Sequence, residues 1–519
     1  PVEPTTNVAL VNERFDILST SAGFTRMYEH LVMESAGFGI RCSCHSGDTR
    51  TLSGNRVKML LCPANEVKKS PTQRSTTRHR ALRCYRQEDS PFGGPMSKTA
   101  PTAIVGLGYV GLPLAQAAVR AGVPIVGFDI NEKTVAGLTA GRSPISDIDD
   151  DGIAAMLATG FAPTTDPAEL DACDTFIICV PTPLSDDQGP DLTAVKAAVR
   201  GLVGHINVGD LVVLESTTYP GTTEEVVGPI LAESGLSVPG DVNLAFSPER
   251  VDPGNAVYGI TNTPKVVGGV DEKSGEAAAA FYSQFCDTVV MASGAKEAEL
   301  AKLLENTYRH VNIALVNELA LLSHELEIDL WDAIRCAATK PFGFQAFYPG
   351  PGVGGHCIPI DPNYLSHHVR SRLGHTFRFV ELAQDINSAM PGYVCRRVQD
   401  LLNENSKAVR GSRIVIVGIT YKPNVADSRE SPSRPIASTL LGMGADLTYW
   451  DPFVDEWTVD GTPVPRVDDL HAAVASGDID AVLLLQQHKQ LDLGLLQSGS
   501  VPVFDTRAVL EQQDSVERL

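Results

Sequence analysis

Short hydrophobic runs alternate with longer amphipathic segments from about residue 100 onward. Segments rich in Ala and Leu, such as residues 110–121, predict helices between the runs. The β-branched runs predict strands at residues 103–105, 125–129, 175–180, 211–214 and 242–246. Strands that alternate with helices are typical of a parallel, doubly wound α/β sheet.

The pattern changes at residues 296–328, which form a long helical stretch without Gly or Pro. A loop rich in Pro and Gly follows at 347–355, and helical text continues to about Asn405. A second strand series then predicts a smaller α/β unit, with strands at residues 413–418, 446–450, 481–485 and 501–504. The expected fold is α/β, with an N-terminal Rossmann dinucleotide-binding domain, a central helical domain and a C-terminal Rossmann-like domain.

The first part of the chain lacks this regularity. It is basic and rich in Ser and Thr between residues 68 and 86, and Met96 stands just before the first strand. We therefore expect residues 1–98 to be a disordered or artefactual extension. The expected domains are then residues 99–295 for the first α/β domain, 296–405 for the central helices with the Pro- and Gly-rich loop, and 406–519 for the second α/β domain.

Composition excludes several classes of protein. The formal net charge of -21 repels phosphate backbones, so a nucleic-acid partner is not expected. No apolar run approaches the roughly 18 residues that a membrane helix needs. The ten cysteines are irregularly spaced in a chain of 519 residues, which favours reduced thiols and a cytoplasmic location. Their spacing fits no ordinary zinc pattern, so no metal is expected.

A glycine-rich turn follows the first predicted strand. Gly106, Gly108 and Gly111 form G-x-G-x-x-G at the start of a helix, and Asp129 ends the second strand about 20 residues later. The glycines allow a tight turn, close approach of a pyrophosphate and close helix packing. A carboxylate at the second strand binds ribose hydroxyls and repels a 2′-phosphate, so the pattern favours NAD over NADP.

A candidate nucleophile lies in the Pro- and Gly-rich loop. Cys357 follows two glycines, and Asp361 stands four residues later. A thiolate adds readily to an aldehyde, and oxidation of the adduct leaves a thioester that water can hydrolyse. The sequence alone leaves an inert, buried cysteine as the alternative for this position.

Together these residues resemble the UDP-glucose/GDP-mannose dehydrogenase family over roughly residues 100–512. The turn from Gly106 to Gly111, with Tyr109 and Val110, is similar to the family's NAD-binding loop, and Asp129 to its ribose-binding acid. The resemblance implies that Thr182, in Val-Pro-Thr-Pro, lies near the nicotinamide. Cys357 and Asp361 match the family's nucleophile and its partner.

The same resemblance assigns roles to four further residues in the order in which the family has them. Thr217 stands in E-S-T, ahead of P-G-T, and would hold a catalytic water beside the cofactor. Glu249 ends S-P-E and is a candidate base. Lys302 and Asn306 match K-x-x-x-N, so the lysine would stabilise a developing oxyanion and the asparagine would hold water or substrate.

In the last predicted domain, the resemblance points to cations that would bind an anionic ligand. Tyr421 and Lys422 would bind the diphosphate, and Arg429 would reach the cofactor. Arg507 is a further diphosphate contact. Lys340, upstream of the cysteine loop, matches a residue that reaches the nucleotide of a partner subunit, so a homodimer or higher homo-oligomer is expected.

Two departures bear on the substrate. The chain reads GGHCIPID where the UDP-glucose branch reads GGYCLPKD, and Pro253 replaces the second glutamate of that branch's SPEFLRE motif. The text FYPGPGVGGHCIPIDP is similar to the branch that acts on UDP-N-acetylhexosamines, especially UDP-N-acetylglucosamine. That sugar nucleotide is the expected substrate, with UDP-N-acetylmannosamine and UDP-glucose as alternatives.

The expected reaction is a four-electron oxidation of the sugar's C6 alcohol to a carboxylate, using NAD and a thioester on Cys357. A single-step hydroxyacid dehydrogenase is one alternative, and it would release one NADH per product. A non-catalytic nucleotide-sugar binding protein is another, and it would have no need of a thiolate. Counting the NADH released per sugar separates these three hypotheses.

Overall fold

The computed structural model describes residues 34–35, 40–41, 83–86, 100–145, 147–185, 189–250, 255, 257–355 and 361–519. The chain divides into two compact units, Pro1–Thr77 and Arg78–Leu519. In the first unit, β1 (Glu34–Ser35) and β2 (Ile40–Arg41) pair as an antiparallel ladder. All further elements belong to the second unit.

The second unit begins with a nine-stranded sheet in the order β3-β11-β10-β9-β8-β7-β4-β5-β6. Six strands form its parallel, doubly wound part: β4 (Thr102–Val105), β5 (Ile125–Phe128), β6 (Phe161–Thr164), β7 (Thr175–Ile178), β8 (Leu211–Leu214) and β9 (Asn243–Phe246). β10 (Lys265–Gly269) runs antiparallel to β9, and β11 (Thr288–Met291) parallel to β10. The sheet is therefore mixed, and not wholly parallel as the sequence pattern predicted. Antiparallel neighbours need no crossover helix, so β10 can be placed beside β9 without one.

The edge of this sheet contains a strand that the sequence did not predict. β3 (Arg83–Arg86) pairs antiparallel with β11, within the segment 1–98 expected to lack structure. Arg83 also forms ion pairs with Glu272 at 3.0 Å and Glu276 at 3.7 Å, both on α6 (Glu272–Tyr282). Backbone pairing, rather than a hydrophobic pattern, recruits these residues to the fold.

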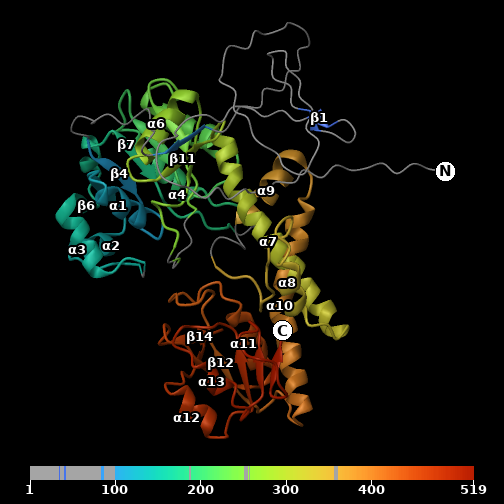
Figure 1. The fold of residues 1–519 in the computed structure, drawn as a ribbon. Helices are drawn as coiled ribbons and strands as arrows, with labels where there is room; N and C mark the ends of the chain where they lie inside the picture. Colours follow the sequence, from blue (N-terminus) through green and yellow to red (C-terminus); the bar gives the residue numbers. More distant parts are fainter. Residues whose placement is uncertain are drawn as a thin grey trace, which may run out of the picture. The chain divides into compact units, whose positions relative to one another are not determined.

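Helices cover both faces of the sheet (Figure 1). They are α1 (Gly111–Arg120), α2 (Glu132–Thr139), α3 (Asp150–Thr159), α4 (Thr193–Leu202), α5 (Gly228–Leu231) and α6. Alternate strand residues enter separate hydrophobic clusters: Ile177 and Val213 in one, Ile178 and Val212 in the other. A sheet buried on both faces explains why its strands read as nearly continuous apolar runs.

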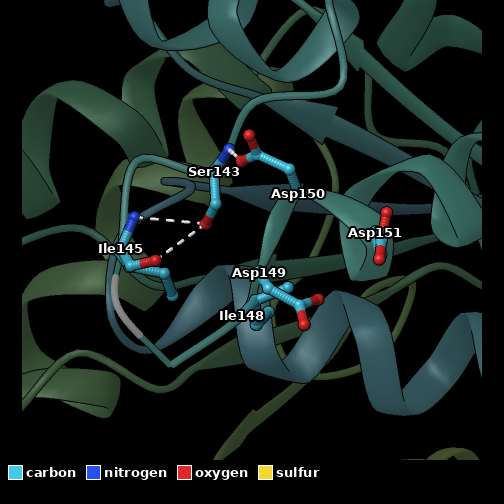
Figure 2. A pocket seen from close by; sticks show the side chains of 6 residues that line it. All are labelled: Ser143, Ile145, Ile148, Asp149, Asp150 and Asp151. Atoms are coloured by element: carbon cyan, nitrogen blue, oxygen red, sulfur yellow. Dashed lines mark hydrogen bonds between the residues drawn. The ribbon is translucent and has the colours of Figure 1, made fainter.

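The loop that leads into α3 is held by its own polar groups (Figure 2). Ser143 donates its backbone N–H to Asp150 at 2.8 Å, and Asp149 caps the helix by accepting from Gly152 N at 2.8 Å. The hollow shown in Figure 2 is also lined by Ile145 and other residues of this loop. Asp149 therefore caps α3 and Asp150 fastens the preceding loop, so the hollow is a structural feature of the α3 entrance.

Long helices follow the first sheet: α7 (Ala295–Glu325), α8 (Leu330–Ala337), α9 (Asp361–Leu373) and α10 (Arg378–Glu404). α7 and α10 run side by side (Figure 1), where Asn317 Nδ2 donates to Asn387 Oδ1 at 2.9 Å. The sequence correctly predicted the long helix: the predicted start is one residue after the observed start, and the predicted end is three residues beyond the observed end. Among the described helices, none combines the length and hydropathy of a membrane span.

The last domain holds a five-stranded parallel sheet in the order β13-β12-β16-β17-β18. Its strands are β12 (Arg413–Val417), β13 (Asp446–Trp450), β16 (Ala481–Leu484), β17 (Val503–Asp505) and β18 (Val516–Arg518). α11 (Ser433–Met443), α12 (Leu470–Ala475), α13 (Leu493–Leu496) and a hairpin of β14 (Trp457–Val459) and β15 (Thr462–Val464) complete it. The expected fold class, two α/β units around a helical middle, is confirmed.

Candidate active site

The three glycines of the first turn do different work. Gly106 has φ +97°, and a Cβ there would lie 2.8 Å from the carbonyl oxygen of Cys179. A Cβ on Gly111 would lie 1.9 Å from the carbonyl oxygen of Gly106, so the helix can pack closely only with glycine here. Gly108, in contrast, meets nothing within 4 Å. The turn therefore leaves open space at its middle glycine, where a dinucleotide pyrophosphate would approach.

Asp129, directly after β5, stabilises the same turn through hydrogen bonds. Asp129 Oδ2 accepts from Leu107 N at 2.9 Å, and Oδ1 accepts from Asn131 N at 2.9 Å. Its side chain stays partly exposed, and each carboxylate oxygen has a second lone pair. The arrangement fits a ribose that donates its hydroxyls to Asp129. Tyr109 is 44% exposed on the same loop, and Val110 is half-buried.

One face of α7 brings four of the predicted site residues together. Lys302 Nζ donates to Thr217 Oγ1 at 2.5 Å, and Asn306 Nδ2 donates to Asp361 Oδ2 at 2.6 Å. Lys302, Asn306 and Asp361 are all buried. Thr217 follows β8, and Asp361 is the first residue of α9. One face of α7 therefore connects the carboxyl end of β8 to the start of α9.

Burial changes the acid strength of Asp361. Loss of solvation raises its pKa to about 6, while the charge of Lys302 and the hydrogen bond from Asn306 oppose the rise. A carboxyl group with such a pKa exchanges protons near neutral pH. It is therefore suited to orient or deprotonate a water molecule.

A buried ionic cluster lies beside Glu249. Lys265 Nζ is 2.6 Å from Glu215 Oε1 and 3.9 Å from Glu249 Oε2, and Tyr282 donates its hydroxyl to Glu215 at 2.5 Å. Burial disfavours the charged form of Lys265, but the two carboxylates outweigh burial and raise its pKa. The sequence analysis missed Lys265 and Tyr282. A single lysine at the start of the strand text KVVGG was the available signal.

The expected nicotinamide loop is attached to α9. Tyr364, which is fully buried, donates its hydroxyl to the carbonyl oxygen of Thr182. Thr182 itself is partly buried. Because Tyr364 stands one helical turn after Asp361, α9 positions both the acid and this loop.

Cys357, the predicted nucleophile, lies outside the described residues. The described end of its loop packs against the last domain. Gly355 has φ +91° and donates its N–H to the carbonyl oxygen of Glu430 at 3.2 Å. A Cβ at Gly355 would lie 3.0 Å from the ring of Tyr421, and one at Gly354 would lie 2.6 Å from the Glu430 carbonyl oxygen. Glycine is thus required where the loop meets Tyr421.

The predicted cations of the last domain occupy distinct settings. Arg429 forms a fork with Asp427, with N···O distances of 3.0 and 2.9 Å, and this hydrogen bonding raises its pKa. Arg507 donates Nε to the carbonyl oxygen of Leu485 at 2.8 Å; burial lowers its pKa to about 10, which still leaves it charged at neutral pH. Lys422 is half-buried two residues after Thr420, whose hydroxyl donates to the Lys422 carbonyl.

Two of these cations lie near parts of the other domains. A Cβ on Gly350, in the loop before the cysteine, would lie 3.1 Å from Arg507 Nη1. The hydroxyl of Tyr109, on the first glycine turn, interacts electrostatically with Arg429. Lys340 is different: it is exposed, with its ammonium group 5.0 Å from the centre of the Phe342 ring. Among the described contacts, none joins Lys340 to the other predicted site residues.

Three family models match successive parts of the chain. Residues 100–286 match the NAD binding domain of the UDP-glucose/GDP-mannose dehydrogenase family, 296–389 its central domain, and 415–512 its UDP binding domain. The matched segments coincide with the first sheet, the long helices and the second sheet. The order along the chain is that of the complete family architecture.

Named relatives match most of the chain. UDP-N-acetyl-D-mannosamine dehydrogenase from Methanococcus maripaludis strain C7 is 34% identical over 79% of this chain and 92% of its own. NDP-N-acetyl-D-galactosaminuronic acid dehydrogenase from Ralstonia nicotianae is 35% identical over 78% and 95%. Among solved structures, UDP-D-ManNAc dehydrogenase from Pyrococcus horikoshii superposes with a TM-score of 0.71 at 30% identity, covering 80% of this chain and 98% of that one. The chain therefore belongs to the UDP-glucose/GDP-mannose dehydrogenase family and is an NAD-dependent nucleotide-sugar dehydrogenase.

Proposed function

We propose that the chain oxidises the C6 alcohol of a UDP-N-acetylhexosamine to a carboxylate, with UDP-N-acetylmannosamine as the first candidate. The relatives reported above are named for N-acetylmannosamine and N-acetylgalactosaminuronic acid, so their names share an acetamido group and differ in epimer. They favour the mannosamine alternative over the glucosamine reading of the sequence. The match of residues 415–512 to a UDP binding domain supports uridine as the nucleotide.

The observation that carries this proposal is the shared face of α7. It presents an ammonium group to Thr217 and an amide to Asp361, with all four side chains at least partly shielded from solvent. A cation beside a hydroxyl suits a reaction in which an alkoxide develops on a substrate oxygen, because the cation stabilises negative charge. A buried acid with a raised pKa, on the same face, suits the activation of water.

In the proposed reaction, Gly106, Gly108, Gly111 and Asp129 hold NAD, which supplies the hydride acceptor for each of two two-electron oxidations. A water held by Thr217 takes the proton of the C6 hydroxyl while the Lys302 ammonium stabilises the developing alkoxide; alternatively, Lys302 acts as the base in its neutral amine form. The Cys357 thiolate then adds to the aldehyde carbon and retains it as a thiohemiacetal. After the second oxidation, a water oriented by Asp361 and Glu249 attacks the thioester, which releases the carboxylate and restores the thiol.

The test is a panel of UDP- and GDP-sugars assayed with the purified full chain. We expect two NADH per sugar and the highest kcat/KM with UDP-N-acetylmannosamine. One NADH per product would instead support the single-step dehydrogenase, and binding without NADH release would support the non-catalytic nucleotide-sugar binding protein. Maximal kcat/KM with UDP-glucose would overturn the acetamido assignment.

The covalent step has its own test. Cys357→Ser should abolish carboxylate formation while UDP-sugar affinity stays within a few-fold of wild type. Cys336→Ser, at an exposed cysteine on α8, is the matched control and should keep full activity. Full turnover of the Cys357 variant would refute the thioester.

The homo-oligomer expected from the sequence is also proposed here. α7 exposes several leucines, among them Leu304, Leu315 and Leu322, and its C-cap residue Leu326 is exposed as well. Exposed apolar stripes of this kind are typical of protein–protein contacts. Light scattering on the full chain, with Leu315→Glu and Leu322→Glu as disrupting variants, measures the state. The cytoplasmic location and the domain boundaries 99–295, 296–405 and 406–519 stay predictions.

The role of residues 1–98 can be separated from that of the edge strand within them. A chain that starts at Met96 lacks β3 and leaves the edge of β11 uncovered. A chain that starts at Thr77 keeps β3. If only the shorter chain loses thermal stability, the edge strand matters and the remainder is dispensable.

A further inference from the structure

Glu299 is a buried acid on α7 to which the sequence analysis gave no role. It is only 1% exposed. Its carboxylate accepts three hydrogen bonds from one loop: Gly221 N at 2.5 Å, Thr223 N at 2.9 Å and Thr223 Oγ1 at 2.7 Å. Charge-assisted bonds of this kind are shorter and stronger than neutral ones.

The three bonds fasten the loop that carries Thr217. Thr217 and Gly221 belong to the short connection between β8 and the short helix η3 (Thr223–Val227), and Thr223 is the first residue of η3. Lys302 holds this connection at Thr217, and Glu299 holds it four and six residues later. The two α7 residues are three apart, so their side chains lie on the same face of the helix. Both ends of the connection are thus attached to one rigid element.

A second layer of charges surrounds this attachment. Lys296 forms ion pairs with Glu224 at 3.0 Å and Glu225 at 3.3 Å, and Arg372 of α9 pairs with Glu225. These side chains are 32–56% exposed, so each outer pair is screened by solvent and contributes little to stability. Glu299 is the member that is fully buried.

An ionised acid at this depth is costly unless its oxygens are satisfied. Burial raises the pKa of Glu299 to about 7, while the bonds from Thr223 and Gly221 oppose the rise and Glu224 adds to it. An apolar residue would fill the same space without that cost. Retention of a carboxylate therefore indicates that its hydrogen bonds to the loop matter.

We propose that Glu299 is a positioning residue: it fixes the connection from Thr217 to Thr223 on α7, so that the Thr217 hydroxyl stays within reach of Lys302. The inference rests on the proposed roles of Thr217 and Lys302. Glu299 itself does not touch the reacting atoms. It acts through the geometry of the Lys302–Thr217 pair.

The first test is Glu299→Gln in the full chain. Glutamine has the same size as glutamate but only one acceptor oxygen. Its amide NH2 group is a donor and would face the loop N–H groups, which are donors too. A displacement of about 1 Å at reacting groups costs roughly 100-fold in rate, so we expect kcat to fall about 10- to 100-fold. The KM values for NAD and for the sugar nucleotide should change less than about three-fold, since the binding groups remain. Glu224→Gln, on the same loop but in the exposed layer, is the matched control and should keep kcat.

The second test is a double-mutant cycle with Thr217→Ala, measured in single turnover with enzyme in excess so that slow variants are still quantified. If Glu299 acts through Thr217, the Glu299→Gln loss should largely disappear in the Thr217→Ala background. Equal losses in both backgrounds, or wild-type kcat in Glu299→Gln, would overturn the proposal. Should Glu299→Gln fail to fold, Thr223→Val removes one of the three bonds and enters the same cycle. The cycle uses whichever sugar nucleotide wild type oxidises best, so failure of the substrate assignment is read separately from wild-type rates.

Discussion

The two α/β domains build the same turn at the end of their first strand and then use it differently. In the first domain, Gly106 N donates to Phe128 O at 2.8 Å; in the last, Gly418 N donates to Trp450 O at 2.9 Å. Both glycines have positive φ, +97° and +77°. A Cβ at Gly418 would lie 2.1 Å from the carbonyl oxygen of Gln486, as one at Gly106 would clash with Cys179. The backbone geometry is therefore shared.

The acids at the ends of the second strands also correspond. Asp129 accepts from Leu107 N and Asn131 N, and Asp451 accepts from Ile419 N at 2.8 Å and Phe453 N at 2.9 Å. Asp129 is partly exposed, whereas Asp451 is completely buried. Aspartates at corresponding positions of the two domains are thus open to solvent in one domain and fully internal in the other.

A histidine accounts for the difference. His488 Nε2 lies 3.0 Å from Asp451 Oδ2, and its Nδ1 accepts from Asn424 N at 3.0 Å, so the proton sits on Nε2. His488 therefore donates a further hydrogen bond to the carboxylate oxygen of Asp451 that already accepts from Ile419 N. The last domain has a longer connection before its helix α11, and that connection carries Tyr421, Lys422 and Arg429. The same turn thus presents an open acid in the first domain and, where the acid is capped, supports a cation-bearing loop in the last domain.

The largest expected effect comes from closing the first turn. Gly111→Val places a side chain where even a Cβ would lie 1.9 Å from the carbonyl oxygen of Gly106. We expect NAD affinity to fall at least about 100-fold, because the helix must move away from the pyrophosphate site. UDP affinity should stay within about two-fold if the two domains bind separately. Isothermal titration with each ligand gives both numbers, and equal losses would show that the domains are not independent.

A smaller effect, on UDP affinity instead of NAD affinity, is expected from a substitution in the cation-bearing loop. Lys422→Ala removes a charge that would contact the diphosphate, and bonds to charged groups are worth roughly 1.5–3 kcal/mol, which corresponds to about 10- to 100-fold in UDP affinity. NAD affinity should not change. Lys489→Ala, at an exposed lysine of the same domain, is the control for net charge. Loss of NAD binding in Lys422→Ala would contradict the assignment.

The capped acid predicts a difference in stability. His488→Ala leaves the buried Asp451 without its ring partner, which should lower the free energy of unfolding by about 1–3 kcal/mol. Removing the corresponding open acid with Asp129→Asn should cost less, because Asp129 is already partly solvated. Urea titrations of the two variants measure this directly. A greater loss for Asp129→Asn would reverse the contrast between the domains.

The smallest effect concerns the helical region that lies between the two domains in sequence. Asp361 has a pKa of about 6, so it is ionised above that pH and becomes protonated below it. If the ionised form orients water, kcat should fall about ten-fold for each unit of pH below 6. Asp361→Asn should have a low kcat at every pH, and its kcat should not show this decrease below pH 6, whichever ligand is saturating. A kcat for wild type that is flat from pH 7 to pH 5 would exclude the role.

Much of the architecture was available from the sequence. The sequence pattern located β8 and β13 to the residue: β8 is a continuous apolar run, and β13 is a short run rich in aromatic residues between turn signals. The long α7 was equally clear because no Gly or Pro interrupts it. Lys302 and Asn306 were placed on one face by spacing alone. The strand β3 was missed, because an edge strand is defined by its neighbour rather than by its own pattern.

The sequence by itself determined the order of domains, the glycine turn, the acid that follows it and the spacing of polar residues on α7, because each is a local or periodic property. Only the tertiary structure decided which of these residues meet. The partners of Glu299 are more than 70 residues away, and those of Asp451 include His488, 37 residues later. Whether a carboxylate is open to a ligand or capped inside the protein depends on such distant partners, since burial and hydrogen bonding are set by packing and not by the residue's own neighbours.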